Sequence, residues 1–147
     1  MIEIRSLEHL EPDQLFVAFS KAFEDYEMQL EKHELETILQ RRGFDPSMSF
    51  GAFDQDQLVA FTFNGTGKYE GVDTAYDTGT GTIKEYRGKG LARRIFLHSV
   101  PTLKKAGITQ YLLEVLQHNE GAVGIVAFLS ACGIHPAGKQ YEMVKEL

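Results

Sequence analysis

Four cations and two glycines lie within eight residues, at the point where an extended segment gives way to a helix. The stretch Thr82–Leu97 reads TIKEYRGKGLARRIFL, and apolar residues then recur every three to four positions, which indicates a helix that begins after the glycines. Glycine lets backbone N–H groups approach a ligand closely, and the first N–H groups of a helix have no partner within it. Such groups at the positive end of a helix bind phosphate. The stretch therefore predicts a phosphate-bearing ligand.

Two common glycine motifs do not fit this stretch. A P-loop would need a glycine where Ile83 stands, and Ser or Thr where Gly90 stands. The dinucleotide pattern G-x-G-x-x-G fails as well, because a cation occupies its last glycine position from either starting point. The spacing that fits is R-x-x-G-x-A, formed by Arg87, Gly90 and Ala92.

This R-x-x-G-x-A spacing, preceded by Glu85-Tyr86, resembles the acetyl-coenzyme A loop of the GNAT superfamily of N-acetyltransferases. The family pattern is Gln or Arg, two residues, Gly, one residue, and Gly or Ala. The resemblance implies that the loop cradles the pyrophosphate of acetyl-coenzyme A. We call residues 87–92 the glycine loop; the cofactor contacts that the resemblance implies there are Arg87, Gly88, Lys89, Gly90, Leu91 and Ala92.

Length and composition predict one soluble domain over residues 1–147. With 43% hydrophobic residues the chain can bury one core. A net charge of −6 argues against a nucleic-acid-binding surface. The single cysteine, Cys132, excludes a disulfide framework or a cysteine metal cluster within one chain and suits the cytoplasm. The five histidines show no metal-ligand spacing with one another, so we expect no metal; no signal core or membrane-spanning run is apparent.

The hydrophobic pattern predicts the element order β, α, α, β, β, β, α, β, α, β, with room for one more strand. The expected elements are a strand over 1–6, helices from Pro12 and over 32–42, a hairpin within 47–63, a strand over 72–83, the central helix after the glycine loop, a strand over 108–116, a helix from Asn119 and a terminal strand pair within 133–147.

Three local expectations concern glycine and proline. Residues 64–71, which contain three glycines, are predicted to form a loop. Gly79 and Gly81 within a strand predict a bulge or a close approach of a ligand. Pro101 lacks a backbone donor inside the central helix, and so predicts a kink or an early end near Val100.

This order is that of the GNAT fold, so the sequence predicts a single α/β (α+β) domain. The resemblance implies a central mixed twisted sheet splayed into a V and flanked by about four helices, with coenzyme A lying between the strands over 72–83 and 108–116. Splayed strands expose backbone groups with which the amides of the pantetheine arm can pair. By resemblance, Thr82 and Ile83 meet that arm and Asn119 contacts the cofactor. Asn119 is equally well interpreted as a helix N-cap.

The resemblance also suggests where a catalytic base lies. An amine is mostly charged at neutral pH, so a base must take its proton before it attacks a thioester. Asp77 lies on the strand of the V, where the family often carries an acidic or histidine residue, and burial would raise its pKa. The alternative is that Asp77 only bonds neighbouring threonines or backbone. Glu114 on the next strand is a second candidate.

The last helix departs from the family pattern, in which a tyrosine about seven residues after the asparagine is the general acid. The residues that stand there are Val126, Phe128 and Leu129. The sequence leaves the acid open between water and three side chains, namely Ser130, Tyr141 and Tyr76, or the thiolate leaves unaided. The missing tyrosine keeps open a catalytically silent module that binds or senses acyl-coenzyme A.

Taken together, the sequence predicts an N-acetyltransferase that moves the acetyl group of acetyl-coenzyme A to a primary amine by direct attack in a ternary complex. The acceptor is open between a small amine, an amino-sugar drug, a polyamine and a protein amine, and its choice is expected to lie in residues 23–36 and 64–71. The carboxylates of 23–36 form a solvated face, or alternatively an anionic lip for a cationic amine.

A further alternative is the aspartic protease signature Asp77-Thr78-Gly79. One copy per chain would require a homodimer to form a carboxylate dyad. The basic, helical sequence that follows the triad disfavours this interpretation. The sequence leaves open whether the protein forms a homodimer.

Overall fold

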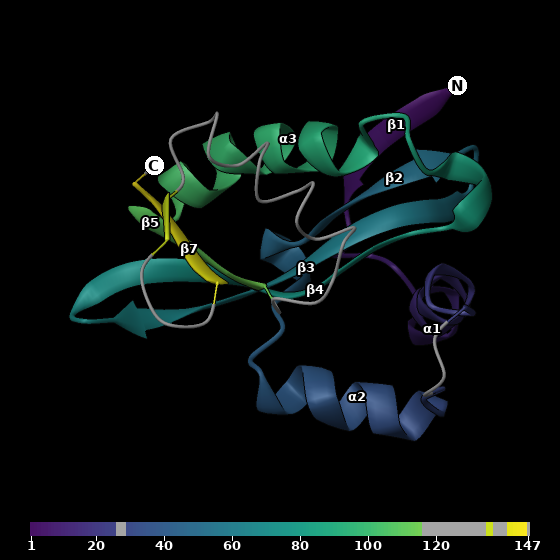
Figure 1. Cartoon of the computed structure of the whole chain (residues 1–147), viewed down its shortest axis with the longest axis horizontal. Helices are drawn as coiled ribbons and strands as arrows, with labels where there is room; N and C mark the ends of the chain where they lie inside the picture. Colours follow the sequence, from purple (N-terminus) through teal and green to yellow (C-terminus); the bar gives the residue numbers. More distant parts are fainter. Residues whose placement is uncertain (26–28, 116–134, 137–140, 147) are drawn as a thin grey trace.

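The computed structural model describes residues 1–25, 29–115, 135–136 and 141–146, and the side chains up to residue 112. The described residues form a seven-stranded mixed sheet in the order β1-β2-β3-β4-β5-β7-β6, which confirms the predicted mixed α/β sheet (Figure 1). The elements are β1 (Ile2–Ser6), α1 (Pro12–Ala22), α2 (Lys32–Arg41), β2 (Phe50–Asp54), β3 (Gln57–Tyr69), β4 (Val72–Thr82), α3 (Leu91–Lys105), β5 (Gln110–Val115), β6 (His135–Pro136) and β7 (Tyr141–Glu146), with short 3₁₀ turns η1 (Pro46–Met48) and η2 (Lys84–Tyr86).

The described helices cover both faces of the sheet, with α1 and α2 on one face and α3 on the other (Figure 1). Phe61 and Phe63 of β3, stacked 4.4 Å apart, lie on the face that α1 and α2 cover. On the opposite face, Val59 and Ala60 pack beneath Leu91 and Ile95 of α3. Strand β3 is therefore buried on both faces, which explains its nearly continuous apolar sequence. None of the helices in the described residues is long and apolar enough to cross a membrane.

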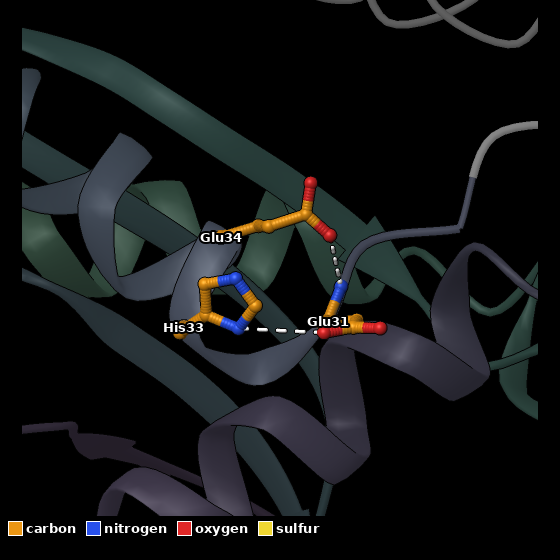
Figure 2. A group of neighbouring side chains, drawn as sticks. All are labelled: Glu31, His33 and Glu34. Atoms are coloured by element: carbon orange, nitrogen blue, oxygen red, sulfur yellow. Dashed lines mark hydrogen bonds and ion pairs between the residues drawn. The ribbon is translucent and has the colours of Figure 1, made fainter.

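Both N-terminal helices begin with a capping box. In α1 the box joins Glu11 and Gln14, and Pro12 occupies the first turn, where its missing N–H costs nothing. In α2, Glu31 N–H donates to Glu34 Oε1 at 3.0 Å, as Figure 2 shows. These caps fix where the helices start, close to the predicted positions.

The predicted splay of the sheet is confirmed between β4 and β5. The two strands pair in parallel at Thr74–Gln110, Ala75–Tyr111 and Tyr76–Leu112 only, among the described residues. Beyond Tyr76, β4 continues to Thr82 while β5 pairs with β7. The second half of β4 therefore presents an open edge toward the gap between the strands, which we call the V.

A bulge lies where β4 leaves β5. In the β3–β4 ladder Phe63 faces Gly79 and Asn64 faces Asp77, so Thr78 is the extra residue of β4. The bulge predicted from the glycines is thus confirmed. Gly81 serves a different purpose, because a Cβ there would lie 3.1 Å from the side chains of Ala22 and Phe23 in and beyond α1. Its lack of a side chain lets the end of α1 pack directly on the open half of β4.

Two local predictions differ from the structure, namely the loop at 64–71 and the early end of the central helix near Val100. Residues 64–69 do not form a loop: β3 runs to Tyr69 and turns through Glu70 and Gly71, both with positive φ, into β4. The glycines within the strand make room for an aromatic ring rather than marking a turn. The central helix does not end near Val100 but continues to Lys105, with Pro101 inside it. Leu97, whose carbonyl loses its donor to Pro101, is 51% exposed, so water can replace the lost bond.

The helix predicted from Asn119 lies outside the described residues, as does most of the segment that connects β5 to β7. The terminal strand pair predicted within 133–147 is confirmed for its described part, since β6 and β7 pair antiparallel.

The side chain of Tyr76 explains why a glycine stands at position 65. A Cβ at Gly65 would lie 2.6 Å from the Tyr76 ring and 2.9 Å from the backbone oxygen of Arg42, which cannot move aside easily. Tyr76 also donates a hydrogen bond from its hydroxyl to that oxygen at 2.8 Å. The ring therefore fastens the end of α2 to the β3–β4 hairpin.

We expect Gly65→Ala to lower the free energy of unfolding by about 1–3 kcal/mol, as overpacking a tight site does. Gly67→Ala is the matched control on the same strand, because a Cβ there meets the Tyr76 ring at an ordinary 3.8 Å. Urea unfolding of both variants measures the difference. Equal stability of the two variants would contradict the role assigned to Tyr76.

Candidate functional site

The glycine loop joins η2 to the N-terminus of α3, and its backbone is open to a ligand. Gly88 and Gly90 have φ of +76° and +72°, a conformation that L side chains rarely adopt. A Cβ built on either glycine meets no atom of the described residues within 4 Å. Among the described residues, the N–H groups from Gly88 to Ala92 donate to no acceptor. The loop therefore offers unpaired N–H groups at the positive end of a 15-residue helix, with space in front of them.

The loop is held in place from β2. Tyr86 of η2 donates its hydroxyl to Asp54 Oδ2 at 2.6 Å, and Lys89 Nζ lies 5.9 Å from the centre of the Tyr86 ring. Arg94 donates to the backbone oxygen of Ile2 at 3.3 Å. These contacts tie the loop and the start of α3 to β2 and β1, and Lys89 and Arg94 place positive charge beside the loop, which suits a phosphate group.

Arg87 does not direct its charge at the space in front of the loop. Its guanidinium donates to Ala22 O at 2.8 Å and to Thr82 O at 3.1 Å, and forms an ion pair with Asp25 at 3.3 Å. The cofactor contact expected of Arg87 stays a prediction. The side chain is committed to the protein, and the glycine loop is left to bind through its N–H groups.

The open edge of β4 offers Thr82 but not Ile83 to a ligand. Ile83 N–H donates to Val59 O on β3 at 2.9 Å, and its carbonyl accepts from Tyr86 N–H. Backbone groups alternate along a strand, so those of Thr80 and Thr82 point away from β3 and toward the V. The Thr82 carbonyl already accepts from Arg87, so the backbone groups of Thr80 and the Thr82 N–H are the ones that face the V, while the Ile83 side chain is buried against α3. The cofactor contact expected at Thr82 and Ile83 stays a prediction.

Asp77 is the first residue of β4 beyond the pairing with β5, at the apex of the V. Its carboxylate accepts a hydrogen bond from Thr80 Oγ1 at 2.5 Å and from Gly79 N–H at 2.8 Å across the bulge. Burial raises the pKa of Asp77, and these two bonds together with the charge of Arg42 offset part of that rise. The bonds to neighbouring residues that the sequence suggested are present, and the raised pKa is compatible with a base. The catalytic role of Asp77 stays a prediction.

A buried polar cluster below Asp77 was missed by the sequence analysis. Asn64, opposite Asp77 in the ladder, is 1% exposed; its side chain accepts from the Tyr111 hydroxyl at 2.8 Å and donates to Met48 O at 2.8 Å. Burial, and next the charge of Asp77, raise the pKa of Tyr111 well above its usual value. Tyr111 therefore stays protonated and links β5 to β3 just below the V. An asparagine at the end of the apolar run LVAFTF was the available signal.

Tyr76, one of the candidates for the general acid, has a structural role in this fold. Its hydroxyl is committed to Arg42 O and its ring packs on Gly65, so it is part of the scaffold. The side chains of Glu114 and Tyr141, as well as Ser130 and Asn119 as a whole, lie outside what the structure describes.

One group of neighbouring side chains in the described residues has metal-ligand geometry: Glu31, His33 and Glu34. Figure 2 shows that these residues are the first turn of α2, where His33 Nδ1 lies 3.4 Å from Glu31 Oε2. All three are exposed, and the Glu34 carboxylate already accepts the capping bond from Glu31 N–H. The group is explained by helix capping.

Comparison with known proteins agrees with this geometry. The model of the family described as "Acetyltransferase (GNAT) family" matches residues 6–133. N-alpha-acetyltransferase 30 of Schizosaccharomyces pombe is 28% identical over 88 residues, which are 59% of this chain and 59% of that protein. The chain therefore spans well under two thirds of that relative's length.

Solved structures share the fold over the whole chain. A protein of Pyrococcus horikoshii OT3 superimposes with a TM-score of 0.76 at 21% identity, covering 100% of this chain and 99% of that one. PaiA N-acetyltransferase of Thermoplasma acidophilum, solved in complex with coenzyme A, has a TM-score of 0.68 at 19% identity, covering 100% and 99%. Identities this low establish the fold alone. Since the family model covers most of the sequence and the fold agrees, the chain belongs to the acetyltransferase (GNAT) family.

Proposed function

We propose that this protein transfers the acetyl group of acetyl-coenzyme A to a primary amine by direct attack in a ternary complex. The observation that carries the proposal is the glycine loop, whose unpaired N–H groups face open space beside the open edge of β4. The pyrophosphate fits the loop, and the pantetheine amides fit the backbone groups of Thr80 and the N–H of Thr82, since the Thr82 carbonyl already accepts from Arg87. Membership of the family and the coenzyme A bound by the Thermoplasma acidophilum protein support the same cosubstrate.

Asp77 is the proposed base. It takes a proton from the ammonium form of the acceptor, directly or through one water, and the neutral nitrogen attacks the thioester carbonyl. The nitrogen then loses its second proton as the carbon–sulfur bond breaks, and that proton passes, directly or through water, to the departing coenzyme A thiolate. A raised pKa and a position at the apex of the V support this role for Asp77. Asn119 remains a proposed contact of the cofactor.

For the acceptor we propose the α-amino group of a protein. The name of the Schizosaccharomyces pombe relative favours this class over polyamines and amino-sugar drugs. An α-amino group has a pKa of about 7.7–8.0, whereas a lysine-like amine has about 10.4. A larger fraction of an α-amine is thus neutral at pH 7, which reduces the demand on a base such as Asp77.

The proposed activity and acceptor are tested by measuring turnover with different amines. The purified protein is incubated with acetyl-coenzyme A and, separately, with a set of short peptides with free N-termini, spermidine and an aminoglycoside, while release of free thiol and acetylated product are followed. Acetylation of peptide N-termini above the rate with N-terminally blocked peptides supports the proposal. Binding of acetyl-coenzyme A without acetylation of any amine would favour the silent module that the missing family tyrosine suggests.

We further propose that the protein acts in the cytoplasm, as its single cysteine suggests. Whether it acts as a monomer or a homodimer is tested by sedimentation of the purified chain with and without coenzyme A.

A further inference from the structure

Arg87 connects three separate parts of the molecule. Its Nη2 reaches Ala22 O at the end of α1, its Nε reaches Thr82 O at the end of β4, and its Nη1 reaches Asp25 beyond α1. The planar guanidinium is suited to such a contact, because it offers five donors in a rigid fork. The first residue of the glycine loop is therefore tied to the helix on the opposite face of the sheet.

The contact with Ala22 closes the C-terminus of α1. Ala22 is the last residue of the helix and is 2% exposed, so its carbonyl has neither an intrahelical partner nor ready access to water. The next two carbonyls, those of Phe23 and Glu24, accept from Gln29 Nε2 at 3.0 Å and 3.4 Å. A cation is also favourable at this negative end of a helix. Arg87 is thus part of the cap that fixes how α1 ends.

The end of α1 in turn rests on the open half of β4. The side chains of Ala22 and Phe23 lie within 3.1 Å of where a Cβ of Gly81 would be. The Phe23 ring also packs against Phe61 of β3, with ring centres 6.4 Å apart. Arg87 therefore links the glycine loop to the place where the end of α1 rests on the open half of β4.

We propose that Arg87 is a positioning residue that couples cofactor binding at the glycine loop to the C-terminal end of α1. This inference rests on the proposed function, since it assumes that coenzyme A binds the loop. When cofactor occupies the loop, the guanidinium holds Ala22 and Asp25 more firmly, so the C-terminal end of α1 opens less often.

Three variants separate this role from direct binding of phosphate. Arg87→Lys keeps the positive charge but cannot reach three acceptors at once, and Arg87→Gln removes the charge. Asp25→Asn removes the anion that holds the guanidinium and leaves Arg87 otherwise intact. If Arg87 bound phosphate as a charge, Arg87→Lys would retain affinity, and Asp25→Asn would increase it by freeing the cation.

Coupling predicts a different pattern. Hydrogen exchange of the amides in residues 19–25 should slow when coenzyme A binds the wild-type protein. Both Arg87→Lys and Arg87→Gln should lose this added protection, and Asp25→Asn should show less of it. Affinity for coenzyme A should fall by about 2- to 30-fold in both Arg87 variants, the range for residues that modulate coupling. The slope of log affinity against log salt should stay that of the wild type, because no phosphate contact is lost.

Lys104→Gln is the control for loss of a charge, since Lys104 is exposed in the last turn of α3, away from the loop. It should keep both affinity and protection. Any of three results would overturn the coupling. The first is wild-type affinity and protection in Arg87→Lys, and the second is tighter binding of coenzyme A by Asp25→Asn. The third is a wild-type protein that binds coenzyme A without added protection. Failure of the wild-type protein to bind coenzyme A would instead overturn the proposed function.

Discussion

Replacing Gly90 with tryptophan is expected to lower affinity for coenzyme A by at least about 100-fold, or about 2.7 kcal/mol. The φ of Gly90 is +72°, and a Cβ there points into open space in front of the N–H groups that would hold the pyrophosphate. A large side chain would fill that space without displacing any atom of the core. Strain in the left-handed conformation costs about 1–2 kcal/mol of stability.

Gly107→Trp is the matched control. Gly107 follows α3, has φ of +85°, and a Cβ there also meets no atom within 4 Å. The control should carry the same backbone strain and bind coenzyme A as the wild type does. Isothermal titration of both variants, with circular dichroism to confirm folding, makes the comparison. Undiminished affinity in a folded Gly90→Trp would remove the glycine loop from the site.

Asp77→Asn is expected to lower kcat by about 100- to 10,000-fold, the usual contribution of a general base. Asparagine keeps an oxygen that can accept from Gly79 N–H, so the bulge should persist and affinity for coenzyme A should be unchanged. Asp73→Asn is the control on the same strand, because it removes only an exposed ion pair with Lys68 at 3.0 Å. Wild-type kcat in Asp77→Asn would show that the carboxylate only holds the bulge.

The raised pKa of Asp77 also fixes the direction of two pH dependences. Activity should rise with pH as Asp77 loses its proton, at a pH above the 3.8 that is ordinary for this group. In the window between 3.8 and the raised pKa, the folded protein binds more protons than the unfolded chain, so stability falls as pH rises. The difference in unfolding free energy between wild type and Asp77→Asn, followed against pH in urea, should therefore decrease across that window and level off above it.

The sequence predicts the fold where periodicity and special residues agree. Pro12 and the apolar stripe after it locate α1, and the glycine loop locates the start of α3, because these features act within a few residues of themselves. The prediction of a loop at 64–71 failed because the glycines of β3 make room for the ring of Tyr76, which contacts them from the neighbouring strand. The early helix end expected near Val100 does not occur for a similar reason. The cost of the hydrogen bond lost at Pro101 depends on the exposure of Leu97, which the local sequence does not show.

The candidate site was predictable in part. The glycine loop follows from local sequence, and in the structure its N–H groups have no acceptor among the described residues. The partners of Arg87 could not be foreseen, because Ala22 lies 65 positions away and meets it only through the fold. The cluster of Asn64 and Tyr111 was missed for the same reason: its members are joined across three strands of the sheet.

The most direct test of the account is calorimetric titration of the purified protein with acetyl-coenzyme A, with desulfo-coenzyme A as the unreactive analogue and a nicotinamide dinucleotide as a second pyrophosphate ligand. We predict micromolar binding of the first two and none of the third, because the loop presents N–H groups to a pyrophosphate while the open edge of β4 selects the pantetheine arm. Absence of binding by acetyl-coenzyme A, or equal binding of the dinucleotide, would contradict the assignment of the glycine loop and the V as a coenzyme A site.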